Sequence, residues 1–234
     1  MILYDGYSNM NTDNPTISCV CLTRRRTAFL RRSVLYFLNQ TFHDAELVIV
    51  YGIDDIESSR FLATLNNPRI RAVAAPHDQG LSLGDLRNWG IQAARGEFVA
   101  IWDDDDYHAP NRLDRQFSKI VETGKDSCFL LRWTVYDSLE NRSYITHPRN
   151  CEGTMVCRKS VIPIYPSVNK AEDTALMLML EARDSIISLD EPALYVYVAH
   201  ANNTWERSHF VDRVMKNADE LSLQQNEKIA ALFS

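Results

Sequence analysis

The sequence predicts an α/β fold with a single mixed sheet flanked by helices, and two observations support this prediction. Short apolar runs alternate along the first half of the chain with segments whose apolar residues recur at helical spacing. This alternation is typical of βαβ units, which build mainly parallel sheets. The runs are also nearly continuous in apolar residues, as strands covered on both faces are. A length of 234 residues fits one domain of ordinary size.

The first half of the chain is expected to contain four strands and three helices. The strands are 17–22, 47–51, 70–75 and 98–102, and the helices lie around 30–38, around 61–65 and over 83–94. Ser82 precedes the third helix and Asp85 follows three residues later, which predicts a capping box at the start of that helix. Gly96 follows the expected end of the helix, as glycine often does.

The pattern changes beyond residue 125. Residues 128–136 and 142–147 are expected to pair as a hairpin, and irregular chain follows them. A helix over 172–183, a strand over 193–200 and a polar amphipathic helix near the C-terminus complete the expected elements. The polar residues 1–15 are expected to form a loose lead-in. We therefore expect a nucleotide-binding first half and a second half that supplies the other wall of a cleft.

Composition and charge exclude several classes of protein. The net charge is −6 and the pI is about 5.5, which argues against a general binder of nucleic acid or of anionic membranes. The five cysteines are odd in number and show no disulfide pattern, so we expect reduced thiols in a cytoplasmic protein. No signal peptide and no apolar run of membrane-spanning length are recognised.

The C-terminal helix is expected to carry an apolar stripe. We expect this stripe to lie in the core or in a homodimer contact, with peripheral membrane contact as the alternative; it comprises Phe210, Val214, Leu221 and Leu223.

Four consecutive aspartates, Asp103–Asp106, directly follow the apolar strand 98–102. Ligands of open α/β sheets bind beyond the carboxyl ends of the strands, where these four side chains would lie. Two like charges about 4 Å apart repel by about 4 kcal/mol at an effective dielectric constant of about 20. A divalent cation such as Mg²⁺ or Mn²⁺ would offset this repulsion and could bridge to a diphosphate. The alternative is a solvated acidic turn that caps the next helix.

Each of three further clusters allows two interpretations, one structural and one chemical. Glu172 and Asp173 begin a predicted helix, either as capping carboxylates or with one of them as a general base. His200 ends a strand, either as a structural residue or as an additional metal ligand. Arg24–Arg26 follow the first strand, either as a solvated turn or as a contact to phosphate or nucleobase. Dinucleotide-binding, P-loop and nucleophile-elbow motifs are absent from the sequence.

The order and spacing of these motifs resemble family 2 glycosyltransferases of the GT-A fold. Asp103–Asp106 fall where that family has its DXD motif, Glu172 and Asp173 resemble its ED motif, and a weaker match resumes at His200 with Asn203 and Thr204. The blocks that carry the resemblance in the first half are 16–23, 30–32, 40–44, 67–71, 80–82, 87–91 and 93–101.

The resemblance implies a metal-dependent, inverting transfer of a sugar from a nucleoside diphosphate donor, UDP or another, to an acceptor hydroxyl in surface glycan or polysaccharide biosynthesis. Residues 16–125 would form the nucleotide-sugar-binding half, 126–204 the acceptor half and 205–234 the C-terminal helix of one domain over 1–234. Asp173 would be the catalytic base with Glu172 as its partner. Asp103, Asp105 and His200 would hold Mn²⁺ or Mg²⁺. The expected donor-binding residues are Thr23, Arg24, Arg26, Asp54, Arg87, Asp103 and Asp104.

The sequence departs from the family pattern around the nucleoside. Leu22 replaces a usual proline, and Arg24 and Arg25 replace a usual aromatic residue and asparagine. Residues 51–52, a tyrosine and a glycine, stand where the family usually has two aspartates, the first of which often contacts uracil. Residues 54–55, two aspartates, follow closely and could replace that contact through a shifted loop.

Two other functions remain open from the sequence. A nucleotidyltransferase, or another metal-dependent phosphate enzyme on a similar sheet, would share the cation and the nucleotide but would need no base at Asp173. A non-catalytic module that binds nucleotide sugars would account for the altered residues 51–52, although it would have no need for a costly cluster of carboxylates.

Overall fold

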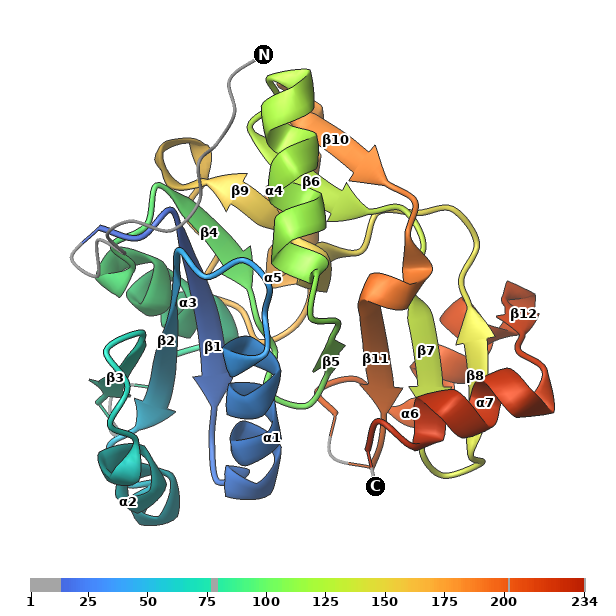
Figure 1. Ribbon diagram of the computed structural model, residues 1–234, viewed down its shortest axis with the longest axis horizontal. Coiled ribbons are helices and arrows are strands. Elements are labelled where there is room, and N and C mark those ends of the chain that lie inside the picture. The colour runs from blue at the N-terminus through green and yellow to red at the C-terminus, as the bar shows by residue number, and fades with distance from the viewer. Residues whose placement is uncertain (1–13, 77–79, 202, 234) are drawn as a thin grey trace.

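The chain folds around two sheets that meet at the aspartate turn (Figure 1). The computed structural model describes residues 14–76, 80–201 and 203–233. Most of the expected lead-in, 1–13, lies outside the described residues. The larger sheet has the order β10-β6-β9-β4-β1-β2-β3. Its strands are β1 (Ile17–Thr23), β2 (Ala45–Gly52), β3 (Ile70–Ala75), β4 (Phe98–Ile101), β6 (Ser127–Leu130), β9 (Val156–Arg158) and β10 (Ile186–Leu189).

The first half of the larger sheet has the expected parallel arrangement. Strand β1 pairs in parallel with β2 and β4, and β2 pairs in parallel with β3. All seven residues of β1 are buried, because Cys19 and Cys21 pack with one helical layer while Val20 and Leu22 pack with the other. The helices are α1 (Thr27–Leu38), α2 (Ile56–Thr64) and α3 (Leu83–Ala93). Both the continuous apolar strands and the α/β class are therefore confirmed.

Helix α3 lies unusually close to the sheet. It begins with the predicted capping box, in which Ser82 and Asp85 each accept a hydrogen bond from the other's backbone N–H. At Gly90, a Cβ atom would lie 2.4 Å from Cγ1 of Val20 and 3.1 Å from Cγ2 of Val50. Glycine is therefore needed at this position for close contact between α3 and the strands β1 and β2.

The expected strand 128–136 is wrong as a single element. Residues 127–130 form β6, which joins the larger sheet between β9 and β10, whereas β7 (Thr134–Asp137) belongs to the second sheet. The expected hairpin is confirmed for β7 and β8 (Arg142–Ile145), which pair antiparallel. Every residue of β6 and of β7 is buried, so the pattern of apolar residues does not mark where the chain changes from one sheet to the other.

The second sheet corrects the prediction of a single sheet. Its order is β12-β8-β7-β11-β5, with β11 (Tyr195–Ala199) parallel to β7 and antiparallel to β5 (Tyr107–His108). Because β4 lies in the larger sheet and β5 in the smaller, the residues between them form the bridge from one sheet to the other (Figure 1). This bridge is Asp103–Asp106 with its flanking residues.

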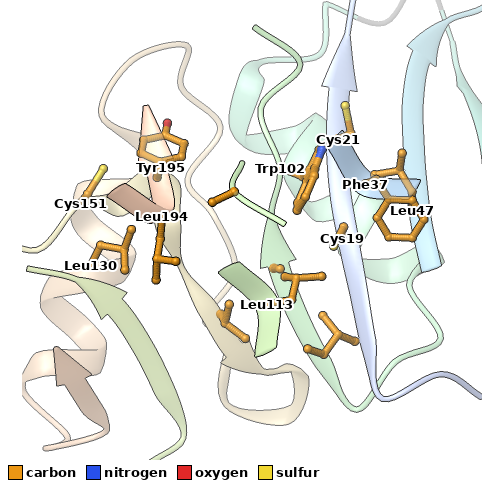
Figure 2. Close-up of a cluster of buried hydrophobic side chains, with 14 of the residues drawn as sticks. Cys19, Cys21, Phe37, Leu47, Trp102, Leu113, Leu130, Cys151, Leu194 and Tyr195 are labelled. Atoms are coloured by element: carbon orange, nitrogen blue, oxygen red, sulfur yellow. The ribbon is translucent and has the colours of Figure 1, made fainter. Parts of the chain in front are cut away.

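The two sheets share one hydrophobic core. A cluster of buried side chains contains Cys19, Phe37 and Trp102 from the first half of the chain and Leu130 and Tyr195 from the second. Figure 2 shows Leu113 between these two groups. Helix α4 (Arg112–Thr123) supplies Leu113, and the remaining long helix of the second half is α5 (Glu172–Glu181). The five cysteines are buried and unpaired, as expected of reduced thiols.

The expected single C-terminal helix is wrong. The segment comprises the short α6 (Arg207–His209), two irregular helical turns over 210–217, the strand β12 (Asp219–Glu220) and α7 (Leu223–Ala230). Phe210 is buried and Val214 packs against the core, which confirms a core contact for this part of the stripe, whereas Leu223 is 75% exposed. Pairing of β12 with β8 interrupts the helix, and Ser222 caps its continuation. No helix of the described residues has the length and apolar character needed to cross a membrane.

We expect Gly90→Ala to destabilise the protein, although the same change in an exposed helix stabilises by up to about 1 kcal/mol. The added methyl group overlaps Val20, so the free energy of unfolding should fall by about 1–3 kcal/mol, as measured by urea denaturation.

The double variant Gly90→Ala with Val20→Ala tests whether the overlap with Val20 causes this loss of stability. Removing the Val20 methyl groups relieves the overlap, so the double variant should lose less stability than the sum of the two single variants. An increase in stability for Gly90→Ala alone would contradict the close contact.

Candidate active site

Each of the four aspartates that follow β4 has a different partner. The Arg87 guanidinium of α3 contacts the Asp103 carboxylate at 2.7 Å. Arg26, at the N-cap of α1, contacts both Asp104 and Asp105 at 2.7 Å. The fourth side chain, Asp106, accepts hydrogen bonds from the Tyr195 hydroxyl and, at 2.9 Å, from the Val198 N–H on β11. The repulsion expected within the quartet is therefore offset by two arginines and by hydrogen bonds from the second sheet.

The pKa values of Asp104, Asp105 and Asp106 differ because their environments differ. Burial, together with the neighbouring Asp105, raises the pKa of Asp104 to about 7. Burial also raises the pKa of Asp106 well above its usual range. For Asp105, burial is outweighed by the hydrogen bond from His200 and the charge of Arg26, so the pKa is lowered. These surroundings thus hold Asp105 ionised.

The expected metal ligands are only partly brought together. Nε2 of His200 lies 3.1 Å from Oδ2 of Asp105. Asp103 is instead directed to Arg87. Among the described residues, no group of three or more histidine, cysteine, aspartate or glutamate side chains is arranged to hold a metal ion, so the predicted trio is not preassembled. The carboxylate and the imidazole that do meet are donors that fit Mn²⁺ or Mg²⁺.

Arg87 joins the aspartate turn to the Glu172–Asp173 pair. Its Nε lies 3.8 Å from Oε1 of Glu172, the first residue of α5, while its Nη2 contacts Asp103. Arg87 and Glu172 are both buried. Burial, with Glu172 and Glu152 as acidic neighbours, raises the pKa of Asp173 to about 7. Two motifs that are separated by about seventy residues in the sequence therefore form one site, with a carboxyl group poised for proton transfer near neutral pH.

Two adjoining cavities share Asp173 on their walls. We call them the aspartate hollow, with a volume of about 140 Å³, and the aromatic hollow, of about 230 Å³. Both are lined by Asp103, Ala171, Asp173, Tyr197 and Trp205. The aspartate hollow is lined in addition by Arg26, Arg87, Asp105, Asn169, Lys170 and Glu172, among others. The aromatic hollow is lined in addition by Trp133, Arg149, Glu152, Tyr195, His209 and Phe210, among others.

A third cavity, the β2 hollow, has a volume of about 220 Å³ and lies at the ends of β1, β2 and β3. Its lining includes Thr23, Arg24, Tyr51, Gly52 and Asp54. A Cβ atom at Gly52 would lie only 2.7 Å from Oδ1 of Asp54. The Asp54 carboxylate therefore occupies the space that a side chain at position 52 would take.

Asp55 has a different and structural position. Its carboxylate caps α2 by accepting hydrogen bonds from the Ser58 N–H at 3.1 Å and from the Arg25 N–H at 2.5 Å. Asp54 and Asp55 are the two aspartates that could replace the family's usual pair. Asp54 lines the β2 hollow, whereas Asp55 stabilises the loop before α2. Arg25 also contacts Asp54 at 2.7 Å.

The sequence did not single out the aromatic lining of the site. Trp133 lies in the expected strand 128–136 and Trp205 in irregular chain, and a tryptophan on a cavity wall cannot be distinguished by spacing from one in the core. Lys170 was also not identified, and its ammonium group lies 5.0 Å from the centre of the Trp205 ring. The position of Trp205, directly after Asn203 and Thr204 of the weak family match, is the signal that could have indicated it.

The chain is similar in sequence to a family of known proteins. Residues 18–174 match the family model described as glycosyl transferase family 2. A curated relative, the putative colanic acid biosynthesis glycosyl transferase WcaA of Escherichia coli, is 28% identical over 162 residues, which cover 66% of this chain and 50% of WcaA. The chain spans about half the length of the curated relatives it matches.

Two solved structures resemble the fold. TarS 1–349 of S. aureus in complex with UDP superposes with a TM-score of 0.66 at 18% identity, covering 92% of this chain and 69% of that one. The mannosyltransferase PcManGT of Pyrobaculum calidifontis, in complex with GDP-Man and Mn²⁺, has a TM-score of 0.59 at 15% identity, covering 83% of this chain and 59% of that one. At these identities the likeness shows the fold alone, and it confirms the expected GT-A architecture.

Proposed function

The chain belongs to glycosyl transferase family 2, and on that premise we propose that it transfers a sugar, with inversion and with the help of a divalent metal, from a nucleoside diphosphate donor to an acceptor hydroxyl. One observation carries the proposal: Asp173 lies on the wall shared by the aspartate hollow and the aromatic hollow. A general base must reach the proton of the attacking hydroxyl while the leaving group departs on the other side. A carboxylate between two cavities meets this requirement.

The β2 hollow is the proposed site of the nucleoside. Tyr51 offers an aromatic ring, and Asp54 offers a carboxylate to an N–H group of the base. Uracil and guanine both present such an N–H beside a carbonyl group, and Arg24 on the same wall could donate to that carbonyl. The two structural neighbours are complexes with UDP and with GDP-Man, which supports either base for this chain.

The aspartate hollow is the proposed site of the diphosphate. Asp105 and His200 would hold Mn²⁺ or Mg²⁺, which supplies positive charge to the departing diphosphate. Arg26 and Lys170 line the same hollow and can bind phosphate oxygens. Arg87 offsets the negative charge of Asp103 and Glu172, because it contacts both of those carboxylates.

The aromatic hollow is the proposed site of the acceptor. Trp133, Tyr197 and Trp205 offer apolar ring faces of the kind that line small-molecule sites, and Arg149 and Glu152 add polar groups that fix orientation. Asp173 would take the proton from the acceptor hydroxyl as its oxygen bonds to the anomeric carbon. The bond from that carbon to the diphosphate oxygen breaks with its electron pair on the diphosphate, so one displacement inverts the configuration.

The wider setting is also a proposal. The relative named for colanic acid biosynthesis supports a role in polysaccharide biosynthesis. The buried, unpaired cysteines support a cytoplasmic location. The family match favours sugar transfer over nucleotidyl transfer, and the position of Asp173 on the wall shared by two hollows favours a catalyst over a binding module.

We expect Asp173→Asn to lower the turnover number by about 10²- to 10⁴-fold, the usual contribution of a general base. For the parent enzyme, turnover should rise with pH through about 7, because only the deprotonated Asp173 accepts a proton. Nucleoside diphosphate release and glycoside formation, measured by chromatography from pH 5.5 to 8.5, would show both effects.

The matched control is Asp190→Asn, which changes an exposed aspartate paired with Arg132 and should leave turnover unchanged. Equal rates for Asp173→Asn and the parent would refute the assigned base. Release of pyrophosphate from a nucleoside triphosphate would instead support the nucleotidyltransferase alternative.

Metal binding can be tested without activity. Asp105→Asn and His200→Ala should each weaken Mn²⁺ binding, measured by electron paramagnetic resonance of free Mn²⁺, by about tenfold or more because each removes a proposed ligand. Treatment with EDTA should abolish transfer, and Mn²⁺ should restore it. His43→Ala, at an exposed loop position, should bind Mn²⁺ as the parent does.

The nucleoside assignment predicts a selective loss of affinity in Asp54→Ala. A hydrogen bond to a charged group contributes about 1.5–3 kcal/mol, so calorimetry should show UDP or GDP, whichever the parent binds more tightly, weakened by about 10- to 150-fold. CDP and ADP lack the N–H donor beside a carbonyl and should be affected much less. Equal loss for all four nucleotides would place Asp54 outside the base contact.

A further inference from the structure

Arg112, the first residue of α4, is a buried cation in unusual surroundings. It is 0% exposed, and in the described part of the chain it takes part in none of the ion pairs. Its guanidinium donates hydrogen bonds to the backbone oxygen of Ile101 at 3.1 Å, to Oε1 of Gln116 at 3.0 Å and to Nδ1 of His108. Burying a charge beside neutral groups alone is costly, so this arginine calls for a role beyond filling space.

The hydrogen-bond partners of His108 assign a single state to its ring. A guanidinium has donors only, so Nδ1 must accept and carries no hydrogen. Nε2 faces the backbone oxygen of Asp103 at 3.1 Å, and because a carbonyl oxygen only accepts, Nε2 must carry the hydrogen. The ring is held in place by stacking on Trp102, with a centroid distance of 3.8 Å.

Arg112 thereby holds the backbone oxygens of the residues before and after Trp102. It binds the last carbonyl of β4 directly, at Ile101, and it binds the carbonyl of Asp103 through His108. The far end of the aspartate turn is held separately, by the hydrogen bonds of Asp106 to β11. Hydrogen bonds therefore fix both ends of the segment that carries Asp103, Asp104 and Asp105. At the start they come from Arg112 and His108, and at the end from β11.

We propose that Arg112 and His108 are positioning residues for the aspartate turn: Arg112 fixes the Nε2–H tautomer of His108, and the resulting hydrogen bond to Asp103 sets the direction of the carboxylates that face the donor. Neither side chain lines the aspartate hollow, so both act through the backbone of Asp103. The kinetic consequence rests on the proposed function, whereas the assigned tautomer does not.

The tautomer can be measured directly. In protein labelled with ¹⁵N-histidine, a long-range ¹H–¹⁵N correlation spectrum at pH 7 should show His108 protonated at Nε2 and unprotonated at Nδ1. In Arg112→Met, which removes the donor to Nδ1, the two nitrogen shifts of His108 should move toward a mixture of tautomers. A parent protein with the hydrogen on Nδ1, or with both nitrogens protonated, would overturn the proposal whatever the protein catalyses.

Kinetics then separate positioning from simple stability. His108→Phe keeps a ring on Trp102 but cannot donate to Asp103, so the KM for the donor should rise by about tenfold. The KM for the acceptor should stay within about twofold, because most of the aromatic hollow, including Trp133, Arg149 and Glu152, is lined by residues outside the aspartate turn. His108→Gln can place an amide N–H near the position of Nε2 and should recover part of the loss.

Arg115→Met is the matched control, since Arg115 lies on the same helix but is half exposed and pairs with Glu191. This variant should keep parent values of both KM constants. Circular dichroism would confirm that each variant is folded before it is assayed. A folded His108→Phe variant with an unchanged donor KM, or with donor and acceptor KM raised together, would overturn the positioning role. A parent enzyme that transfers no sugar would refute the proposed function and leave the tautomer result standing.

Discussion

The site depends on two arginines that neutralise a dense group of carboxylates. Arg26 contacts Asp104 and Asp105, and Arg87 contacts Asp103 while lying close to Glu172. Buried carboxylates without such partners would either protonate or force the turn apart. Because Arg26 precedes α1 and Arg87 lies on α3, the helices that cover the larger sheet also deliver the charges that make the aspartate turn stable.

The second constraint is the junction between the two sheets. The aspartate turn leaves β4 of one sheet and enters β5 of the other, and Asp106 binds to β11 next to it. A single core spans the junction, so the β2 hollow keeps a fixed relation to the adjoining aspartate and aromatic hollows. A reaction between two substrates needs this kind of fixed relation, because misplacement by about 1 Å is costly in rate.

The sequence predicts the parts of this arrangement that local pattern determines. The parallel strands are recognisable because burial on both faces makes them continuously apolar, and the capping box at Ser82 depends on residues three apart. The change of sheet between β6 and β7 was not predictable, because burial is complete on both sides of it. The choice between Asp54 and Asp55 was likewise hidden, since it depends on the space left by Gly52 and on the cap of α2. Family resemblance identified the two acidic motifs, but only the fold shows that Arg87 joins them.

The same residue type performs different tasks in this site because its environments differ. Asp105 is held ionised by His200 and Arg26, as a ligand for a cation must be. Asp173, half-buried beside other acids, has its pKa raised to about 7, which suits the proposed general base at neutral pH. Asp106 is buried more completely and serves β11 through its hydrogen bonds. Separation of the pKa values of neighbouring carboxyl groups would allow the proposed site to combine binding of positive charge with base catalysis. In the proposed positioning role, Arg112 and His108 bear on that chemistry through the backbone of Asp103, although neither lines the aspartate hollow.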